Sequence, residues 1–223
     1  LKDLNKNEYQ TYRREVQGIF QDPYSAVNPL RRVGYVFRIL TKKIADSEQD
    51  AHKLINSVLL DVGLGESFLK KFPHQMSGGE LQRLMIARAF VLRPKIIVAD
   101  EPVSMLDASL RATVLKIMLD MKEKYDTSFL YITHDLSTAY YMADEVIVLY
   151  QGNMVEHGDP DAVVKKPRHP YTRVLTSSIP RPDPSRRWVD RVDISKMEVG
   201  IGEFKGCRFY GRCQEAIGRC AQD

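Results

Sequence analysis

Short apolar runs alternate with amphipathic stretches along the first two thirds of the chain. Runs of strand length lie at residues 16–20, 96–100, 128–133 and 146–150, and residues 152–156 are predicted to return along the last run as a hairpin. Apolar residues at three- and four-residue spacing predict helices over residues 33–69, 78–92, 108–125 and 137–142. Because the strands are continuously apolar and alternate with helices, we expect an α/β fold with a parallel sheet covered on both faces.

The composition changes after Gly158. A proline-rich connector follows and leads into a basic end that contains all three cysteines; its prolines are Pro160, Pro167, Pro170, Pro180, Pro182 and Pro184. Residues 165–223 carry a net charge of +6, whereas residues 1–164 carry −2. We therefore predict a domain over residues 1–158, with a helical subdomain at about residues 24–92, and a C-terminal extension over residues 159–223. No apolar stretch approaches the roughly 20 residues that span a bilayer.

The apolar run that begins at Lys95 ends in two adjacent carboxylates, Asp100 and Glu101, and Asp107 follows them. A buried strand that delivers acid groups to a sheet edge is typical of phosphoryl chemistry, in which one carboxylate holds Mg²⁺ and its neighbour prepares a water molecule. On this pattern alone, an acid pair that only caps the next helix is an equal alternative.

A second motif, Ser77-Gly78-Gly79-Glu80, precedes a predicted helix. It has the form of a capping box, in which Ser77 accepts from the backbone N–H of Glu80 and Glu80 reaches back. Glycine is a poor choice for a first helical turn unless something must approach the backbone closely. Since free N–H groups at a helix start bind anions, the motif predicts a cap that also offers a phosphate-facing surface.

Two further polar residues, Gln21 and His134, each follow directly after a predicted strand. The carboxyl ends of parallel strands are where such sheets place their sites. Each residue taken alone is more typical of an ordinary sheet edge. The chain contains no Gly-x-x-x-x-Gly-Lys-Ser/Thr loop, which is the usual phosphate cradle of this chemistry.

Taken together and in this order, the motifs resemble those of the nucleotide-binding subunit of an ABC transporter. Gln21 matches the Q-loop, residues 76–83 the signature motif, residues 96–101 the Walker B strand, residues 104–107 the D-loop, and residues 133–135 the switch histidine. Residues 20–29, the segment His169-Pro170-Tyr171-Thr172-Arg173 and the cysteine-bearing tail resemble the oligopeptide/dipeptide importer branch. Met76 and Met105 depart mildly from the usual leucine and alanine.

The resemblance implies a P-loop NTPase core that uses ATP and Mg²⁺. By that analogy Glu101 and His134 are catalytic, Asp100 and Gln21 hold Mg²⁺, and the remaining nucleotide-binding residues are Ser77, Gly78, Gly79, Glu80 and Asp107. The Walker A loop of the family lies upstream of the Q-loop, so we expect it before Leu1. Without that loop we expect the chain alone to be inactive as an ATPase.

The resemblance also implies partners and a location. The implied partners are a second ABC ATPase subunit, identical or paralogous, transmembrane permease subunits that contact the loop at residues 22–29, and indirectly an extracytoplasmic solute-binding protein. The chain would power import of peptides or related small solutes, as a peripheral protein at the cytoplasmic face of the membrane. One alternative is a catalytically incomplete module that supplies a signature half-site to a partner.

The basic tail alone suggests another alternative, a soluble ABC ATPase that acts on nucleic acid. The loop after Gln21 and the segment from His169 to Arg173 argue against this alternative, so no nucleic-acid partner is expected. The three cysteines are Cys207, Cys213 and Cys220, and their spacing is too wide for a usual zinc knuckle. Related tails carry four cysteines, some of which bind a [4Fe–4S] cluster, so cluster ligands and simple reduced thiols both stay open.

Overall fold

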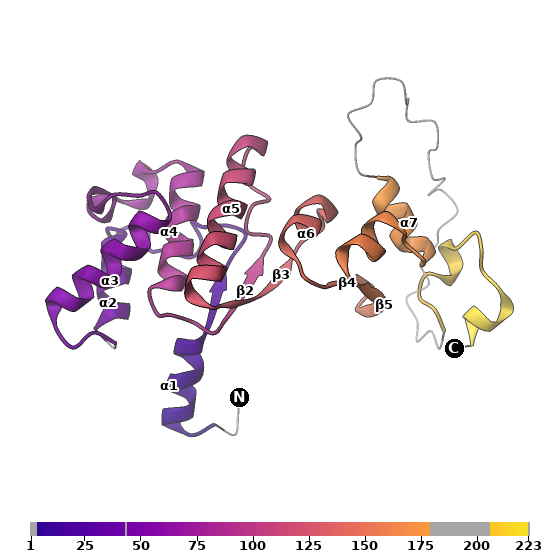
Figure 1. The fold of residues 1–223 in the computed structure, drawn as a ribbon, viewed down its shortest axis with the longest axis horizontal. Coiled ribbons are helices and arrows are strands. Elements are labelled where there is room, and N and C mark those ends of the chain that lie inside the picture. The colour runs from indigo at the N-terminus through magenta and orange to yellow at the C-terminus, as the bar shows by residue number, and fades with distance from the viewer. Residues whose placement is uncertain (1–3, 43, 179–205, 223) are drawn as a thin grey trace. The chain divides into compact units, whose positions relative to one another are not determined.

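The computed structural model describes residues 4–42, 44–178 and 206–222. The chain divides into two units, Leu1–His134 and Asp135–Asp223, and each is described by itself (Figure 1). This division differs from the predicted boundary after residue 158, which stays a prediction. Pro180, Pro182 and Pro184 of the predicted connector lie outside the described residues.

The first unit contains the predicted strands and helices up to the histidine. Its elements are α1 (Lys6–Glu15), β1 (Val16–Ile19), α2 (Gly34–Thr41), α3 (Glu48–Asp61), η1 (Glu66–Lys70), η2 (Pro73–Gln75), α4 (Gly78–Phe90), β2 (Ile96–Asp100), α5 (Ala108–Tyr125) and β3 (Ser128–Ile132). The long helical stretch predicted over residues 33–69 is divided in the structure. One division follows α3, where Gly63 has a φ of +68°, a backbone conformation that favours glycine.

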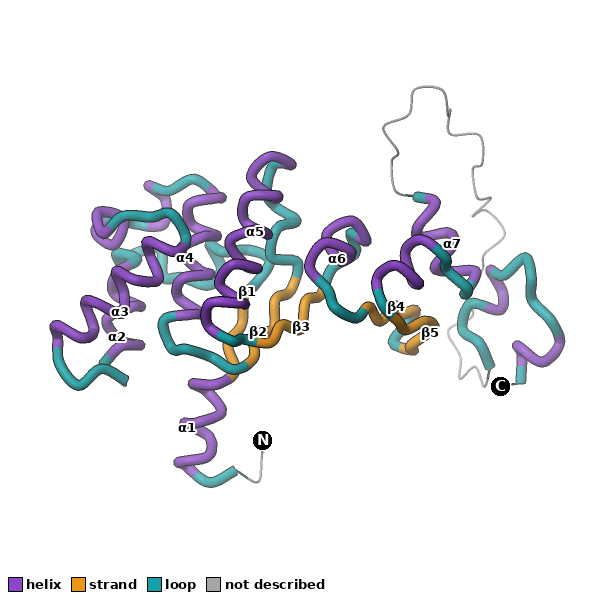
Figure 2. The backbone as a smooth tube through the Cα atoms, in the orientation of Figure 1, coloured by secondary structure: helices purple, strands orange, loops and turns teal. Residues whose placement is uncertain are grey.

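The strands of this unit form a parallel sheet in the order β1-β2-β3, as predicted, and Figure 2 shows them side by side. One face is buried: Ile97 and Ala99 of β2 are fully buried, and the Phe90 ring of α4 lies 6.1 Å from that of Phe129 in β3. Alternate side chains point to the other face. There Ile96, Leu130 and Ile132 are 43%, 56% and 45% exposed.

Two features of the sheet differ from the expectation. Within the first unit one face is covered and the other carries exposed apolar side chains, so coverage of both faces stays a prediction. The run at residues 146–150 does not join the parallel sheet. It pairs antiparallel with β5 in a separate two-stranded sheet.

The second unit is built around that hairpin. Its elements are α6 (Leu136–Met142), β4 (Val146–Tyr150), β5 (Asn153–Gly158), the π-helical turn η3 (Asp161–Lys165), α7 (Pro170–Ser177), η5 (Tyr210–Arg212) and η6 (Gly218–Ala221). Val146, Val148 and Val163 form its small aliphatic core. Phe209 adds an aromatic one, with ring centroids 5.3 Å from Tyr150 and 5.5 Å from Tyr171. Among the described residues, no helix has the length and apolar character needed to cross a membrane.

Glu156 of β5 fastens the segment that leads into α7. Its carboxylate accepts from the backbone N–H groups of Arg168 at 2.8 Å and His169 at 3.0 Å. Burial raises the pKa of Glu156, but these hydrogen bonds outweigh burial and hold the pKa below its ordinary value. A lowered pKa in the folded state means that the stabilisation is present above the unfolded pKa and is lost as pH falls through the folded value.

We therefore expect Glu156→Gln to destabilise the chain at pH 7 by about 1–3 kcal/mol, the usual contribution of hydrogen bonds to a charged group. The difference from wild type should shrink as the pH is lowered through the folded pKa of Glu156, because the wild-type carboxylate is then protonated too. Urea denaturation at pH 7 and in mild acid measures both free energies of unfolding. Glu145→Gln, at an exposed position, is the control. A constant difference between the variants across this range would contradict the assignment.

Candidate functional site

The acid pair lies at the carboxyl end of the central strand. Asp100 is the last residue of β2 and is exposed, opposite Ile132 of β3. Glu101 begins the turn that follows, and its φ of +47° is in the left-handed region, which is unusual for a residue with a side chain. The backbone N–H of Glu101 donates to Ile132 O at 2.9 Å. The turn therefore separates the two carboxylates and is fixed to the end of the neighbouring strand.

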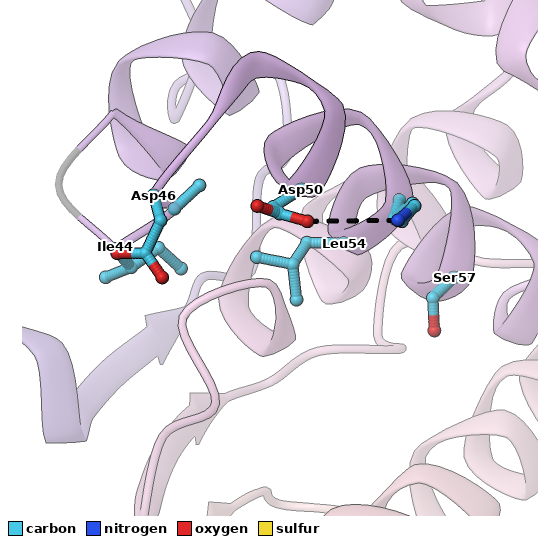
Figure 3. A pocket seen from close by; sticks show the side chains of 7 residues that line it. Ile44, Asp46, Asp50, Leu54 and Ser57 are labelled. Atoms are coloured by element: carbon cyan, nitrogen blue, oxygen red, sulfur yellow. Dashed lines mark ion pairs between the residues drawn. The ribbon is translucent and has the colours of Figure 1, made fainter.

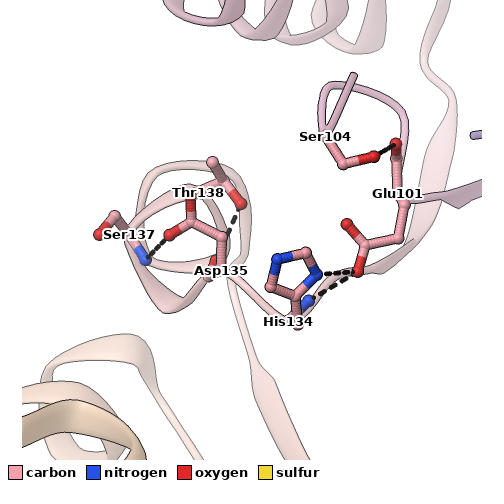
Figure 4. A network of polar contacts seen from close by, with 6 residues as sticks. All are labelled: Glu101, Ser104, His134, Asp135, Ser137 and Thr138. Carbon is pink, nitrogen blue, oxygen red and sulfur yellow. Dashed lines mark hydrogen bonds and ion pairs between the residues drawn. The ribbon is translucent and has the colours of Figure 1, made fainter. Parts of the chain in front are cut away.

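Glu101 and His134 are in direct contact. Glu101 Oε1 lies 2.5 Å from His134 Nδ1 and accepts from the backbone N–H of His134 at 2.9 Å (Figure 4). The Glu101 side chain is 17% exposed and the His134 side chain 78%. Ser104 closes the turn, because its hydroxyl and its N–H donate to Glu101 O at 2.9 and 3.2 Å. A half-buried acid thus faces an accessible imidazole at one sheet edge.

The predicted capping box is present at the start of α4. Ser77 Oγ accepts from the N–H of Glu80 at 3.2 Å, and Glu80 Oε2 accepts from the N–H of Ser77 at 2.8 Å. The bond from the Ser77 backbone lowers the pKa of Glu80. Glu80 is therefore engaged in the cap, and the helix start keeps its remaining N–H groups for another acceptor.

The two glycines of this motif have different surroundings. A Cβ added at Gly79 would lie 3.2 Å from Leu110 Cδ1 of α5, so this position is small because two helices pack closely. A Cβ added at Gly78 would meet nothing within 4 Å. Packing within the chain therefore does not require glycine at position 78. A glycine there is consistent with the prediction that a phosphate approaches the start of α4 closely.

The loop after β1 connects the strand end to the capping box. Gln21 is exposed and follows β1, the neighbour of β2, so it lies at the same sheet edge as Asp100. The Tyr24 hydroxyl donates to Met76 O at 3.0 Å, one residue before Ser77. Tyr24 thus connects the loop to the capping box. The sequence does not predict this role, although Tyr24 lies in the segment at residues 20–29 that resembles the importer branch. Asp107 lies apart from these contacts, exposed at the residue before α5.

The structure brings Glu101 and His134 together and places Asp100 and Gln21 at their sheet edge. Within the described part of the chain, Ser77, Gly78, Gly79 and Asp107 make no hydrogen bond or ion pair with this group. That separation is compatible with a site shared between two subunits, because each group would then face a different nucleotide.

The three cysteines are free and half-buried. The N–H of Cys207 donates to Cys220 O at 2.9 Å, and Cys207 Sγ lies 3.8 Å from His169 Nε2. In the described part of the chain, no three His, Cys, Asp or Glu residues are grouped closely enough to hold a metal ion. The iron–sulfur prediction therefore gains no support.

A hollow of about 450 Å³ opens beside the start of α3 (Figure 3). Residues lining it are Ile44, Ala45, Asp46, Asp50, Lys53, Leu54 and Ser57. Asp50 is already paired with Lys53 at 3.9 Å and with the Ser47 hydroxyl at 2.6 Å. No predicted site residue lines the hollow, so it is separate from the acid–histidine edge.

The fold is that of the ABC ATPase family. Residues 1–104 match the family model for ABC transporters. The structure is similar to cbiO1 from Clostridium perfringens, with a TM-score of 0.66 and 24% identity over 74% of this chain and 64% of that one. It is also similar to the dimeric ATP-binding cassette MJ0796, with a TM-score of 0.61 and 28% identity over 71% of this chain and 68% of that one.

More particularly, the chain belongs to the peptide-transport branch of the ABC transporter ATP-binding family. Residues 155–220 match the family model for the oligopeptide/dipeptide transporter C-terminal region. The dipeptide transport ATP-binding protein DppF of Escherichia coli is 39% identical over 99% of this chain and 67% of its own length. The oligopeptide transport ATP-binding protein OppF of Salmonella typhimurium is 36% identical over 100% and 68%. The chain thus spans about two thirds of the curated relatives it matches.

Proposed function

We propose that this chain binds and hydrolyses ATP as a subunit that powers an importer of peptides or related small solutes. The observation that carries the proposal is the contact of Glu101 with His134 at the carboxyl edge of a parallel sheet. This pair lies in a chain whose relatives are named as peptide transport ATP-binding proteins. Those names favour a subunit that hydrolyses ATP over a module that only supplies a half-site.

The residues at the sheet edge fit Mg²⁺ and a phosphoryl group. Asp100 and Gln21 present exposed oxygen ligands of the kind that Mg²⁺ prefers, and we assign them to the ion. When bound, Mg²⁺ neutralises charge on the phosphate oxygens. Glu101 would orient the attacking water and accept its proton. A carboxylate has two oxygens, so Oε2 can do this while Oε1 keeps its contact with His134 Nδ1. His134 would donate towards the phosphoryl oxygens through Nε2.

The other predicted residues would act on a nucleotide held by a partner subunit. The free N–H groups after Ser77 and the open position at Gly78 suit a phosphate that approaches the start of α4. Asp107 is exposed at the residue before α5 and would contact the partner. This division of labour implies a dimer of ATPase subunits, either of two copies or of two paralogues.

Three further proposals follow from membership of the peptide branch. Transmembrane permease subunits would contact the loop at residues 22–29, which Tyr24 fastens to the residue before Ser77. A solute-binding protein outside the membrane would deliver the cargo to those permease subunits. The chain would then lie at the cytoplasmic face of the membrane as a peripheral subunit.

An uptake experiment tests the proposed function. Deleting the gene in the source organism should lower uptake of a labelled dipeptide at least tenfold, and the wild-type gene on a plasmid should restore it. The control is uptake of a labelled free amino acid, which should not change. If dipeptide and oligopeptide uptake both stay at the wild-type rate, peptide import is the wrong function.

A second prediction concerns a polypeptide of these 223 residues alone. We expect no ATP hydrolysis above background, because the sequence contains no Gly-x-x-x-x-Gly-Lys-Ser/Thr loop to cradle the β- and γ-phosphates. Joining a segment with such a loop ahead of Leu1 should restore turnover. The measurement is phosphate release at saturating ATP and Mg²⁺. Steady turnover by the 223 residues that Glu101→Gln abolishes would contradict the prediction.

A further inference from the structure

One buried polar side chain joins the signature helix to the acid turn. Gln82 lies on α4, five positions after Ser77, and is 1% exposed. Its Nε2 donates to Pro102 O at 2.7 Å, and Pro102 is the residue directly after Glu101. Five helical residues span about 7.5 Å, so only this short length of α4 separates the capping box from the hydrogen bond to Pro102.

The acid turn depends on few bonds. Glu101 O accepts from Ser104, and Val103 O accepts from the N–H of Leu106 at 3.1 Å. The carbonyl between them, Pro102 O, accepts from the Gln82 side chain. Because Pro102 has no N–H, the turn also has one backbone donor fewer for hydrogen bonds within it. The Gln82 bond therefore holds the middle of the turn that places the Glu101 carboxylate.

Stability alone gives a weak reason for an amide at this position. Among the described residues, Gln82 Oε1 is buried without a hydrogen-bond partner. Leaving a buried acceptor unpaired costs at least as much as one hydrogen bond contributes, so a methionine of similar length would serve the packing equally well. The function of the Gln82 amide is therefore its donor group, which fixes the position of the Pro102 carbonyl.

We propose that Gln82 is a positioning residue that couples the start of α4 to Glu101. This inference rests on the proposed function for its meaning: Ser77 would face a nucleotide held by a partner, while Glu101 acts on the chain's own. A displacement of α4 when its start binds phosphate would then be passed through Gln82 to the Pro102 carbonyl and the acid turn. The two composite sites of the dimer would be linked by one hydrogen bond.

Amide hydrogen exchange of the full chain tests the coupling without ATP. Gln82→Met should accelerate exchange at the N–H groups of Ser104 and His134 by about fivefold, the effect of losing one net hydrogen bond, while the melting temperature stays the same or rises. Arg83→Met is the matched control. Arg83 Nη1 donates to Val62 O at 3.1 Å and Gly63 O at 3.3 Å, so its loss should accelerate exchange near Gly63 and leave Ser104 and His134 unchanged.

A second variant covers the case in which Gln82→Met does not fold. Gln82→Asn keeps an amide but withdraws it by one methylene, and it should accelerate the same two N–H groups. Exchange within twofold of wild type at Ser104 and His134 would overturn the proposal, as would an equal loss of protection throughout α4, β2 and α5. In the assembled transporter, Gln82→Met should lower kcat for ATP by about tenfold with KM changed less than twofold, and an unchanged kcat would also overturn it. If the assembled transporter hydrolyses no ATP, the proposed function fails, but the exchange result still decides the coupling.

Discussion

Replacing Glu101 with glutamine is expected to lower ATP hydrolysis in the assembled transporter by about 10²–10⁴-fold, the usual contribution of a positioned general base. The amide has the shape of the carboxylate and can still accept from the His134 N–H, which lies 2.9 Å from Glu101 Oε1. It cannot accept a proton from water. Hydrolysis should therefore be lost while the turn keeps its structure, and ATP-driven pairing of subunits should persist. Phosphate release and gel filtration in ATP measure the two properties.

The control for this variant is Glu123→Gln, an exposed carboxylate near the end of α5. It makes the same chemical change away from the sheet edge and should leave hydrolysis within twofold of wild type. Turnover above one tenth of wild type in Glu101→Gln would remove Glu101 from the role of general base. Loss of ATP-driven pairing together with loss of hydrolysis would instead show that the substitution disturbs the turn.

The central strand and the helix after it could be predicted with the bounds that the structure shows, residues 96–100 and 108–125. Both carry strong local signals. A β-branched run lies between Pro94 and an acid pair, and apolar residues at helical spacing continue to Tyr125, after which Asp126 takes a left-handed backbone conformation. The edge position of Asp100 follows from the end of that strand. The contact between Glu101 and His134 could not be predicted in the same way, because it depends on β2 and β3 ending in register.

What could not be predicted is mostly tertiary. A continuously apolar strand indicates that both faces avoid water, yet Leu130 and Ile132 are exposed among the described residues, because strand composition does not say which element covers each face. The hairpin predicted for residues 146–156 is present, but the run at residues 146–150 has the same composition as a parallel strand, so its separation from the parallel sheet could not be predicted. Gln82 gave one faint signal, a polar residue among the apolar ones of α4. Its bond to Pro102 spans 20 residues of sequence, which periodicity does not reveal.

Phe209 is expected to hold the C-terminal segment against the second unit. Its side chain is 5% exposed, and its ring contacts three others at centroid distances of 5.3 Å for Tyr150, 5.5 Å for Tyr171 and 5.9 Å for His169. Arg173 adds a bidentate pair with Glu215 at 2.5 and 3.1 Å, but that pair is exposed and contributes little. The ring is therefore the main apolar attachment of residues 206–222 to the rest of the second unit.

Phe209→Ala should destabilise this attachment by about 3–5 kcal/mol, the usual cost of removing a buried phenylalanine. Trypsin should then cut after Arg208 and Arg212 in minutes, whereas the wild-type chain should resist cleavage there. Ile217→Ala is the matched control, because Ile217 lies in the same segment but is 63% exposed, so its loss should change stability by less than about 0.5 kcal/mol. Equal cleavage rates in the two variants would show that the segment is held by its polar contacts. Loss of peptide uptake in Phe209→Ala with hydrolysis intact would assign the attached tail to a contact that the ATPase reaction does not need.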